Sequence, residues 1–459
     1  LIKSLVPNAV IFGREDVRWC GNEAGGTRST EWNVVPYQAN PDTMSNFADM
    51  TDKDLGSREQ LYKAKYLHYQ QAETNTSIRE GWFYRDDTHQ QVRSTDDVFD
   101  IYERAVGGNS TFLLNIPPNR NGKFSPTDVA VLKETGQRIR ETYGTDLFRQ
   151  AEGPKEVLDQ NADTYVTADK DGAGIVISTP QPVTLNRLVL QEAIAANGER
   201  VERHAVDAWI DGGWKEIAHA TNIGYKRILR FPDVTTDKIR VRILESRLTP
   251  AICTISAHHY KARPPRLSAQ RSMDGLVTIE PMAQEFGWKA HGENIAENLN
   301  AGFKIYYTTD GTEPSAGSTE YKAPFLMGNS ELKVVAILNG EKGAILQERF
   351  GLVKKGWKIA DKTAQSLAID LGSQQTVSGF AFTPQKQGGK GTVAGIIRIS
   401  NDGKNWKEVE RFEFGNLIND PSKRYHHFKQ TVKARYVQVE AAEIAAHTEA
   451  AALAGIDIF

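Results

Sequence analysis

Carboxylates, arginines and a tryptophan gather in one short run near the start of the 459-residue chain. Residues 14–26 contain three carboxylates, two arginines and one tryptophan, among them Arg18, Trp19 and Glu23. Cleavage of a glycosidic bond uses one carboxylic acid to protonate the leaving oxygen and a second carboxylate to attack the sugar or to activate water. An arginine can hold ring hydroxyls, and an aromatic ring can stack on the apolar side of a sugar. Composition alone therefore indicates either glycoside chemistry or a solvated loop.

The elements around this run determine where its side chains can point. An apolar strand is predicted at residues 9–12, directly before the run, and strand-like and helix-like patterns alternate through residues 1–147. The predicted strands cover residues 8–13 and 110–116, and the predicted helices cover residues 58–69, 96–106 and 126–143, the last capped by Ser125. This alternation predicts a parallel sheet with crossover helices, in which catalytic groups follow the carboxyl ends of the strands. Because a complete β/α barrel takes about 250 residues, the segment predicts about half of one.

From residue 148 onward, the pattern changes to short β-runs separated by turn residues. The expected strands cover residues 165–167, 174–178, 185–191, 203–210, 214–220, 238–244, 303–308, 331–338, 434–440 and 456–459. The predicted fold class is therefore multidomain, a partial β/α (TIM-like) barrel followed by β-sandwich domains. The predicted domains are a C-terminal barrel half (1–147), a β-sandwich (148–262), a small immunoglobulin-like module (263–353) and a further β-sandwich (354–459).

Three motifs in the first domain resemble glycoside hydrolase family 29, the α-L-fucosidases. They are RWCGNEAG at residues 18–25 followed by TEW at 30–32, ETNTSIREGWFY at 73–84, and LLNIPPNRNGKF at 113–124. The WCGNE form resembles the subfamily that acts on α-1,3- and α-1,4-linked fucose in branched glycans. The resemblance implies a retaining exo-α-L-fucosidase that removes terminal L-fucose from a fucosylated oligosaccharide or glycoconjugate. It also implies a bacterial enzyme of the periplasm or the extracellular space, although no secretion signal is visible after Leu1.

The resemblance also implies roles for particular residues. Glu23 matches the general acid/base, and the expected substrate-binding residues are Trp82, Trp19, Arg18, Glu31, Trp32 and Glu73. For Glu73, a buried structural carboxylate is an equal alternative. The family's aspartate nucleophile, in a WFDGA-like motif, has no match in the 459 residues, and neither has its HWG-type motif. By the family's spacing both would precede Leu1, so the chain is expected to be part of a longer enzyme.

Two downstream segments resemble modules that accompany glycosidases. Residues 305–314 resemble the small module at the C-terminus of chitobiases, for which a spacer role is expected. Residues 355–459 resemble a discoidin or coagulation-factor C-type domain of the carbohydrate-binding kind. Its candidate sugar contacts are Trp357, His426 and His427, which are expected in loops.

Several classes of function receive no support from the sequence. The 56 basic and 58 acidic residues nearly cancel, so nucleic acid is not an expected partner. No apolar run approaches the roughly 20 residues of a membrane-spanning helix. No cofactor is expected, and no metal, because the pairs His258–His259 and His426–His427 lack ligand spacing. Two alternatives stay open, a non-catalytic carbohydrate-binding protein and a glycoside hydrolase of other specificity.

Overall fold

The computed structural model divides the chain into two units. It describes residues 1–13, 16–21, 23–45, 47, 51–79, 81–84, 92–167, 174–281, 302–383, 391–414, 423–445 and 455–459, with the backbone alone at 391–393 and 443–445. Unit 1 comprises Leu1–Ala262, and the described residues from 263 onward belong to unit 2. The four predicted domains stay a prediction.

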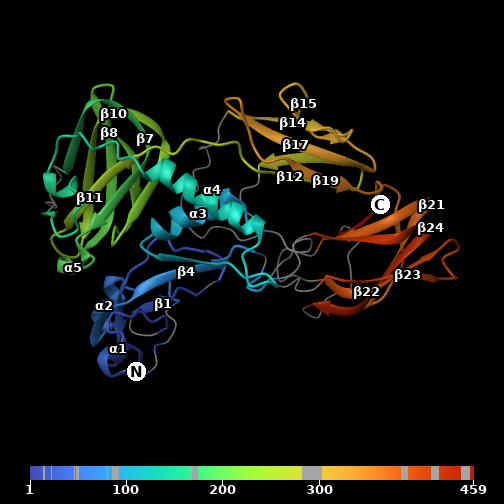
Figure 1. Cartoon of the computed structure of the whole chain (residues 1–459), viewed down its shortest axis with the longest axis horizontal. Helices are drawn as coiled ribbons and strands as arrows, with labels where there is room; N and C mark the ends of the chain where they lie inside the picture. Colours follow the sequence, from blue (N-terminus) through green and yellow to red (C-terminus); the bar gives the residue numbers. More distant parts are fainter. Residues whose placement is uncertain are drawn as a thin grey trace. The chain divides into compact units, whose positions relative to one another are not determined.

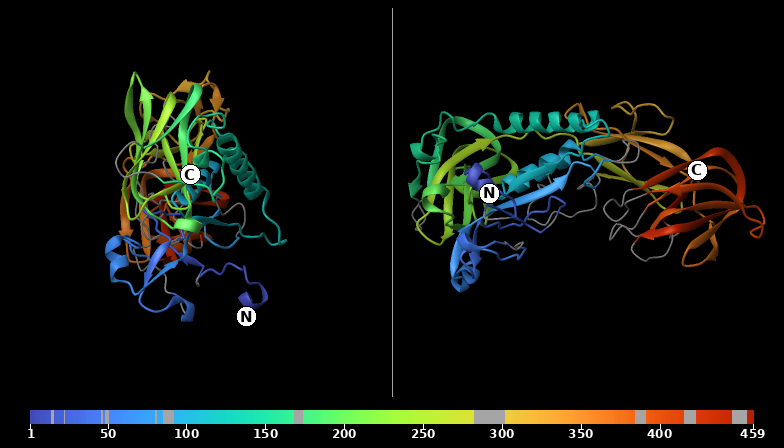
Figure 2. Two further views of the ribbon diagram at one scale, coloured as in Figure 1. Left: turned by 90° about the vertical axis from the view of Figure 1, so that its left-hand side faces the viewer. Right: turned by 60° about the horizontal axis from the view of Figure 1, so that its bottom comes forward.

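A three-stranded parallel sheet forms the first part of unit 1. Its strands are β1 (Val17–Trp19), β4 (Gln71–Ser77) and β5 (Thr111–Asn115), in the order β1-β4-β5. Helix α3 (Thr95–Val106) connects β4 to β5, and α4 (Pro126–Tyr143) follows β5. The two helices pack side by side (Figures 1 and 2). Parallel strands with a crossover helix agree with the predicted sheet, while the barrel itself stays a prediction.

The strand predicted at residues 9–12 is wrong. Phe12 makes only an isolated bridge to Val17, and the strand itself is β1, five residues further on. Val10 and Phe12 are 74% and 50% exposed, whereas Val17 is buried. Apolar character therefore did not decide the position of the strand, because backbone pairing with β4 selects residues 17–19.

The helix predicted at residues 58–69 is correct only in its first half. Helix α2 (Arg58–Lys63) begins after Ser57, whose Oγ accepts a hydrogen bond from the Gln60 N–H at 3.3 Å. The chain then forms β3 (Tyr66–Tyr69), which pairs antiparallel with β2 (Val34–Tyr37). Aromatic residues favour strands, and the pairing satisfies backbone groups that a longer helix would have used. The remaining short helices of unit 1 are α1 (Ile2–Leu5), α5 (Ile194–Asn197) and the 3₁₀ turns Pro41–Thr43 and Lys155–Val157.

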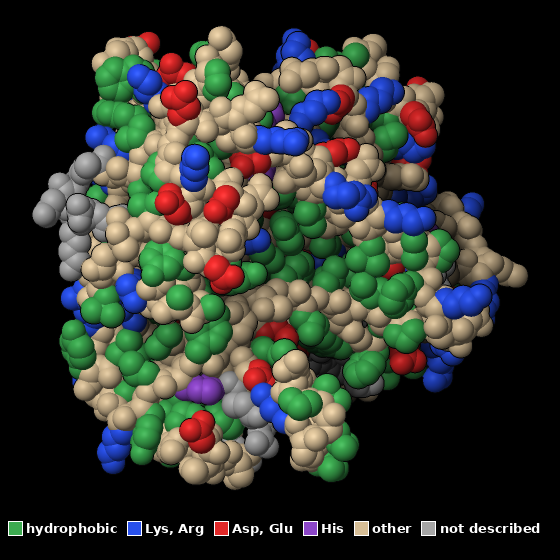
Figure 3. Space-filling model, turned by 60° about the vertical axis from the view of Figure 1, so that its left-hand side comes forward, with side chains coloured by type: hydrophobic (Ala, Val, Ile, Leu, Met, Phe, Trp, Pro, Cys, Tyr) green, Lys and Arg blue, Asp and Glu red, His purple; other side chains and the backbone are tan. Residues whose placement is uncertain are grey.

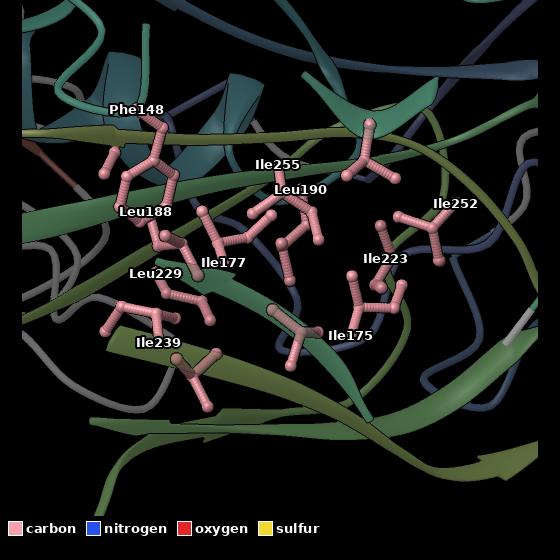
Figure 4. Close-up of a cluster of buried hydrophobic side chains, with 14 of the residues drawn as sticks. Phe148, Ile175, Ile177, Leu188, Leu190, Ile223, Leu229, Ile239, Ile252 and Ile255 are labelled. Atoms are coloured by element: carbon pink, nitrogen blue, oxygen red, sulfur yellow. The ribbon is translucent and has the colours of Figure 1, made fainter. Parts of the chain in front are cut away.

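A six-stranded sheet forms the rest of unit 1. Its order is β6-β11-β7-β10-β8-β9, with antiparallel pairing throughout. The strands are β6 (Val166–Thr167), β7 (Ile175–Glu192), β8 (Val201–Ile210), β9 (Gly213–Ala220), β10 (Arg227–Ser246) and β11 (Ala251–His258). The predicted strands 174–178 and 185–191 are parts of one strand, β7. This strand pairs with β10, and the register of the pairing shifts at two places. The sheet encloses a core of aliphatic side chains and Phe148 (Figure 4).

Strand β11 was not predicted from the sequence. All eight of its residues are buried, so it lacks the alternation that identifies a half-exposed strand. Its polar members find partners across the fold, since His258 pairs with Ser256 at 2.9 Å and with the carbonyl of Thr145 at 2.8 Å.

Buried polar contacts join residues of the first part of unit 1 to the part that contains the six-stranded sheet. Glu103 on α3 accepts hydrogen bonds from Arg187 of β7 at 2.5 and 3.1 Å. Glu199, between β7 and β8, accepts the backbone N–H groups of Asn33 and Val34 at 2.9 and 3.0 Å. A buried charge without a partner is costly, so each part of unit 1 depends on the other for these groups.

Unit 2 consists of β-sheets throughout its described residues. The first sheet contains β12 (Leu267–Arg271), β13 (Leu276–Pro281) and β16 (Phe325–Leu326). The second sheet contains β14 (Lys304–Thr308), β15 (Thr319–Glu320), β17 (Ser330–Leu338), β18 (Glu341–Lys342) and β19 (Leu346–Phe350). The last sheet contains β20 (Lys358–Lys362), β21 (Ser366–Phe382), β22 (Gly391–Ser400), β23 (Lys407–Glu413), β24 (Arg424–Ala445) and β25 (Ile456–Ile458). The first two sheets share one apolar core, and the last sheet has its own.

Candidate active site

Glu23 and Trp82 meet at the carboxyl end of the parallel sheet. Glu23 follows β1 and is exposed, and Trp82 follows β4. The indole Nε1–H of Trp82 donates a hydrogen bond to Glu23 Oε2 at 2.8 Å. Among the described residues, Trp82 is the side chain that donates a hydrogen bond to the Glu23 carboxylate. The structure thus brings together two of the residues that the motifs singled out.

The loop that carries Glu23 is fixed against β4 and α3. Ala24 forms a β-bridge with Thr76, and the Gly25 N–H donates to the carbonyl of Asn75 at 3.0 Å. Gly25 has φ +75°, and a Cβ atom there would lie 3.0–3.2 Å from side-chain atoms of Ile101. Glycine is therefore required both for the backbone conformation and for the close approach to α3.

The segment that carries Trp82 is fixed to β5 and α4. Asn115, the last residue of β5, donates from Nδ2 to the carbonyl of Trp82 at 2.9 Å. One residue after β4 ends, the Ile78 N–H donates to the carbonyl of Asn115 at 2.9 Å. Arg79 donates from Nε to both carboxylate oxygens of Asp128 at 3.0 Å, and both side chains are fully buried. The first turn of α4 thereby fixes the start of the Trp82 segment.

Glu73 lies inside β4 and not at its end. Its side chain is 7% exposed and accepts a hydrogen bond from Asn75 Nδ2 at 3.2 Å. Burial raises the pKa of Glu73, and the hydrogen bond from Asn75 opposes that rise. Glu73 pairs in register with Trp19, so both side chains lie on the face that Asn75, Ser77 and Asn115 also occupy. At its carboxyl end, this polar face of the sheet reaches Ser77 and Asn115, where Trp82 and Glu23 meet.

Arg18 and Glu31 lie on the opposite side of β1. Successive strand residues alternate between faces, so Arg18 points away from the face of its neighbour Trp19. Arg18 and Glu31 are 1% and 4% exposed and form an ion pair. Glu31 also accepts hydrogen bonds from Arg28 Nη1 at 2.8 and 2.9 Å. In the described part of the chain these contacts engage both carboxylate oxygens of Glu31, and a sugar contact for Arg18 or Glu31 stays a prediction.

Trp32 is also buried, at 5% exposure, and its ring is covered by Arg247 with Cζ 3.7 Å from the centroid. Trp32 lines a pocket of about 740 Å³, together with Thr30, residues 57–59, Glu202 and residues 243–247. The pocket is lined by neither Glu23 nor Trp82. It is therefore a feature separate from the contact between those two residues, and a sugar-binding role for Trp32 stays a prediction.

Four residues that shape this region were not singled out as site residues from the sequence. Asn115 belongs to a motif that was used only for the family resemblance, and its position at a strand end was the available signal. Arg79 and Asp128 are 49 residues apart, and no local pattern indicates that they pair. Asn109, at φ +67°, donates from Nδ2 to Glu199 Oε1 at 2.7 Å, a contact across 90 residues.

Of the three candidate sugar contacts near the last sheet, two lie elsewhere than expected, whereas Trp357 is outside any strand, as predicted. His426 and His427 are within β24 and not in a loop, in register with Phe380 and Gly379 of β21. Burial lowers the pKa of His426, which packs against Phe380. Trp357 is 8% exposed and belongs to the apolar core of that sheet. The burial of Trp357 indicates that its side chain packs within this core.

Comparisons with known proteins assign these segments to families. Residues 19–143 match the family described as alpha-L-fucosidase, residues 295–350 the Fn3 associated family, and residues 329–455 the F5/8 type C domain. Alpha-L-fucosidase 1 of Arabidopsis thaliana is 30% identical over 277 residues, which are 55% of this chain and 52% of that protein. The crystal structure of a Bacteroides ovatus protein assigned as an alpha-L-fucosidase aligns with a TM-score of 0.51 and 30% identity, over 100% of this chain and 65% of the other.

The region that contains Glu23 and Trp82 therefore matches a class of domain found in glycoside hydrolases. Within that class, residues 19–143 match the alpha-L-fucosidase family, and a match to the F5/8 type C domain accompanies them, as the motifs predicted. The subfamily stays a prediction. The chain spans about half the length of the curated relatives it matches, 52% of one and 50% of a rice relative, so the activity and substrates of the whole protein remain proposals.

Proposed function

We propose that this chain belongs to a retaining exo-α-L-fucosidase in which Glu23 is the general acid/base. The observation that supports it is the hydrogen bond between Trp82 and Glu23 at the carboxyl end of parallel strands, inside the region that matches the family. Catalytic groups of β/α barrels occupy that end of their strands. The partial barrel is part of this proposal, and the remaining strands would come from sequence upstream of Leu1.

Glu23 acts twice in the proposed reaction. In the first step, its carboxylic acid protonates the glycosidic oxygen while a nucleophilic aspartate attacks the sugar carbon and the glycosidic bond breaks. In the second step, the Glu23 carboxylate takes a proton from the water that releases fucose. The aspartate is expected upstream of Leu1, with the two carboxyl groups about 5–5.5 Å apart. The geometry suits the acid role because Trp82 donates to Oε2, while among the described residues Oε1 is available for the leaving oxygen.

The ring of Trp82 has a second proposed role. Its indole edge faces Glu23, while its face offers an apolar wall for the C–H side of the sugar. On the polar face of β4, Glu73 and Asn75 offer partners for hydroxyls, and Asn75 Oδ1 is buried with no partner among the described residues. Terminal α-1,3- or α-1,4-linked fucose on a glycan is the proposed substrate.

The setting of the enzyme is also a proposal. A bacterial periplasmic or extracellular location follows from the family resemblance. Across the described residues, no helix is both long and apolar enough to span a bilayer. On the face drawn in Figure 3, acidic and basic side chains are interspersed and not gathered by sign, as suits a neutral glycan. The F5/8 type C domain is proposed to bind carbohydrate.

The test of this proposal is Glu23→Gln in a chain extended by its upstream sequence. Loss of the acid should reduce hydrolysis of a natural fucosylated glycan at least about 100-fold more than that of an activated aryl fucoside, whose leaving group needs little protonation. Glu245→Gln, at an exposed glutamate on β10, is the matched control. Equal losses on the two substrates would remove Glu23 from the acid role. A product of inverted configuration would exclude the retaining mechanism, and binding of glycan without any hydrolysis by the unmutated protein would favour a carbohydrate-binding protein.

A further inference from the structure

Three hydrogen bonds connect Asn115 to the end of β4 and to the Trp82 segment. Its Nδ2 donates to Ser77 Oγ at 3.0 Å and to the carbonyl of Trp82 at 2.9 Å. Its own carbonyl accepts the Ile78 N–H at 2.9 Å. One residue of β5 therefore holds both the end of β4 and the backbone of Trp82.

This arrangement bears directly on Glu23. The carboxylate is exposed, and Trp82 provides the hydrogen bond recorded for it among the described residues. An exposed glutamate otherwise samples several rotamers, and a catalytic acid must be held within hydrogen-bond reach of the leaving oxygen. The direction of the indole N–H depends on where the backbone of Trp82 lies, and Asn115 fixes the carbonyl of that residue.

We propose that Asn115 is a positioning residue for the acid/base, acting through Trp82. It does not touch the substrate in this role. Its amide sets the backbone of Trp82, the indole N–H then orients Oε2 of Glu23, and Oε1 is left toward the leaving oxygen. This inference rests on the proposed function for its catalytic consequence, whereas its structural part stands on the three hydrogen bonds alone.

The structural part can be tested on the 459-residue chain without any activity. The chain has 8 tryptophans, so a nitrogen–proton correlation spectrum of their indole groups contains few signals, and Trp82→Phe identifies the one of Trp82. In Glu23→Gln, the Trp82 signal should move upfield because the charged acceptor is lost. Asn115→Ala should move the same signal in the same direction, while the other indole signals stay in place. Asn121→Ala, at an exposed asparagine in the loop that follows β5, should leave all signals unchanged.

The dispersion of the other indole signals in the same spectrum shows whether each variant is folded. If Asn115→Ala loses the dispersion of the other indole signals, Asn115→Asp provides the test, since it keeps the side-chain shape but removes both N–H donors. Ser77→Ala removes one partner of the amide and leaves the bond to Trp82, so it should shift the Trp82 signal less. A Trp82 signal at the unmutated position in a folded Asn115→Ala or Asn115→Asp variant would overturn the proposal.

The catalytic part needs the chain extended by its upstream sequence. Asn115→Asp should lower kcat on a natural glycan about 10- to 100-fold with little change in KM, and should affect an activated aryl fucoside less. A variant that shows the shifted Trp82 signal but unchanged kcat would refute the positioning role. Absence of hydrolysis by the unmutated extended enzyme would instead refute the proposed function, and the spectrum would still decide whether Asn115 orients Trp82.

Discussion

Glu192 should make the stability of unit 1 depend on pH. It is the last residue of β7, is 3% exposed, and accepts the backbone N–H groups of Arg200, Val201 and Gly224 at 2.8, 3.0 and 2.8 Å. Burial raises the pKa of Glu192 to about 7, the three N–H donors oppose that rise, and the nearby charge of Glu199 adds to it. The folded protein therefore retains a proton that a solvated glutamate, with a pKa of 4.5, has released.

The direction of the effect follows from proton linkage. Between pH 4.5 and about 7 the unfolded chain loses the proton of this carboxyl while the folded chain keeps it, so the free energy of unfolding falls as the pH rises. Below this range both states bind the proton, and above it neither does, so the contribution is constant on either side. At about 1.4 kcal/mol for each pH unit, the fall amounts to roughly 3 kcal/mol.

Thiol labelling can measure this change for unit 1 alone. Cys20 and Cys253, the only cysteines of the sequence, are free, buried and within unit 1, so denaturant-dependent labelling with 4,4′-dithiodipyridine reports its unfolding. The unmutated chain should lose roughly 3 kcal/mol more than Glu192→Gln between pH 4.5 and 8. Glu245→Gln, at a glutamate that is 56% exposed, should keep the unmutated pH dependence. The same pH dependence in Glu192→Gln and the unmutated chain would refute the reasoning.

Three further outcomes follow from close contacts. Asp128→Ala removes the carboxylate that pairs with the buried Arg79 guanidinium and should lower the free energy of unfolding of unit 1 by about 3–5 kcal/mol, measured by the same labelling. Gly25→Ala forces φ +75° on a residue with a Cβ atom and should cost about 1–3 kcal/mol, measured in the same way, while a smaller effect of alanine would mean that the β1–β2 loop adjusts. Gly351→Ala would place Cβ 2.1 Å from the carbonyl oxygen of Ile458, so β25 should detach and limited proteolysis followed by mass spectrometry should show earlier loss of the C-terminus.

Elements with local start and stop signals could be predicted from the sequence. Helix α3 begins where Ser94 caps it, with Oγ accepting the Asp97 N–H at 3.1 Å. Helix α4 begins at Pro126 as predicted, but the hydroxyl of Ser125, the predicted cap, makes no capping hydrogen bond. Residues 9–12 and 66–69 had equally plausible local patterns. Their structure was decided by pairing with segments distant in the sequence, which a local pattern does not contain.

The candidate site divides in the same way. The contact between Glu23 and Trp82 could be anticipated because motifs of a known family contain both residues. The burial of Glu31 could not, because it depends on Arg18, 13 residues away on a strand whose position was itself wrongly predicted. The roles of Asn115 and Asp128 likewise appear only once β5 and α4 are placed next to the Trp82 segment.

The carboxylate of Glu199, which accepts the amides of Asn33 and Val34, affects how this protein can be recombined. Separating the chain near residue 147 would leave the amides of Asn33 and Val34 without their acceptor. It would also break the hydrogen bond between Arg187 and Glu103. The six-stranded sheet of unit 1 therefore cannot be separated from the preceding part of the unit without loss of these contacts. In domain shuffling, whether by gene fusion or in the laboratory, residues 1–262 should be inherited as one block.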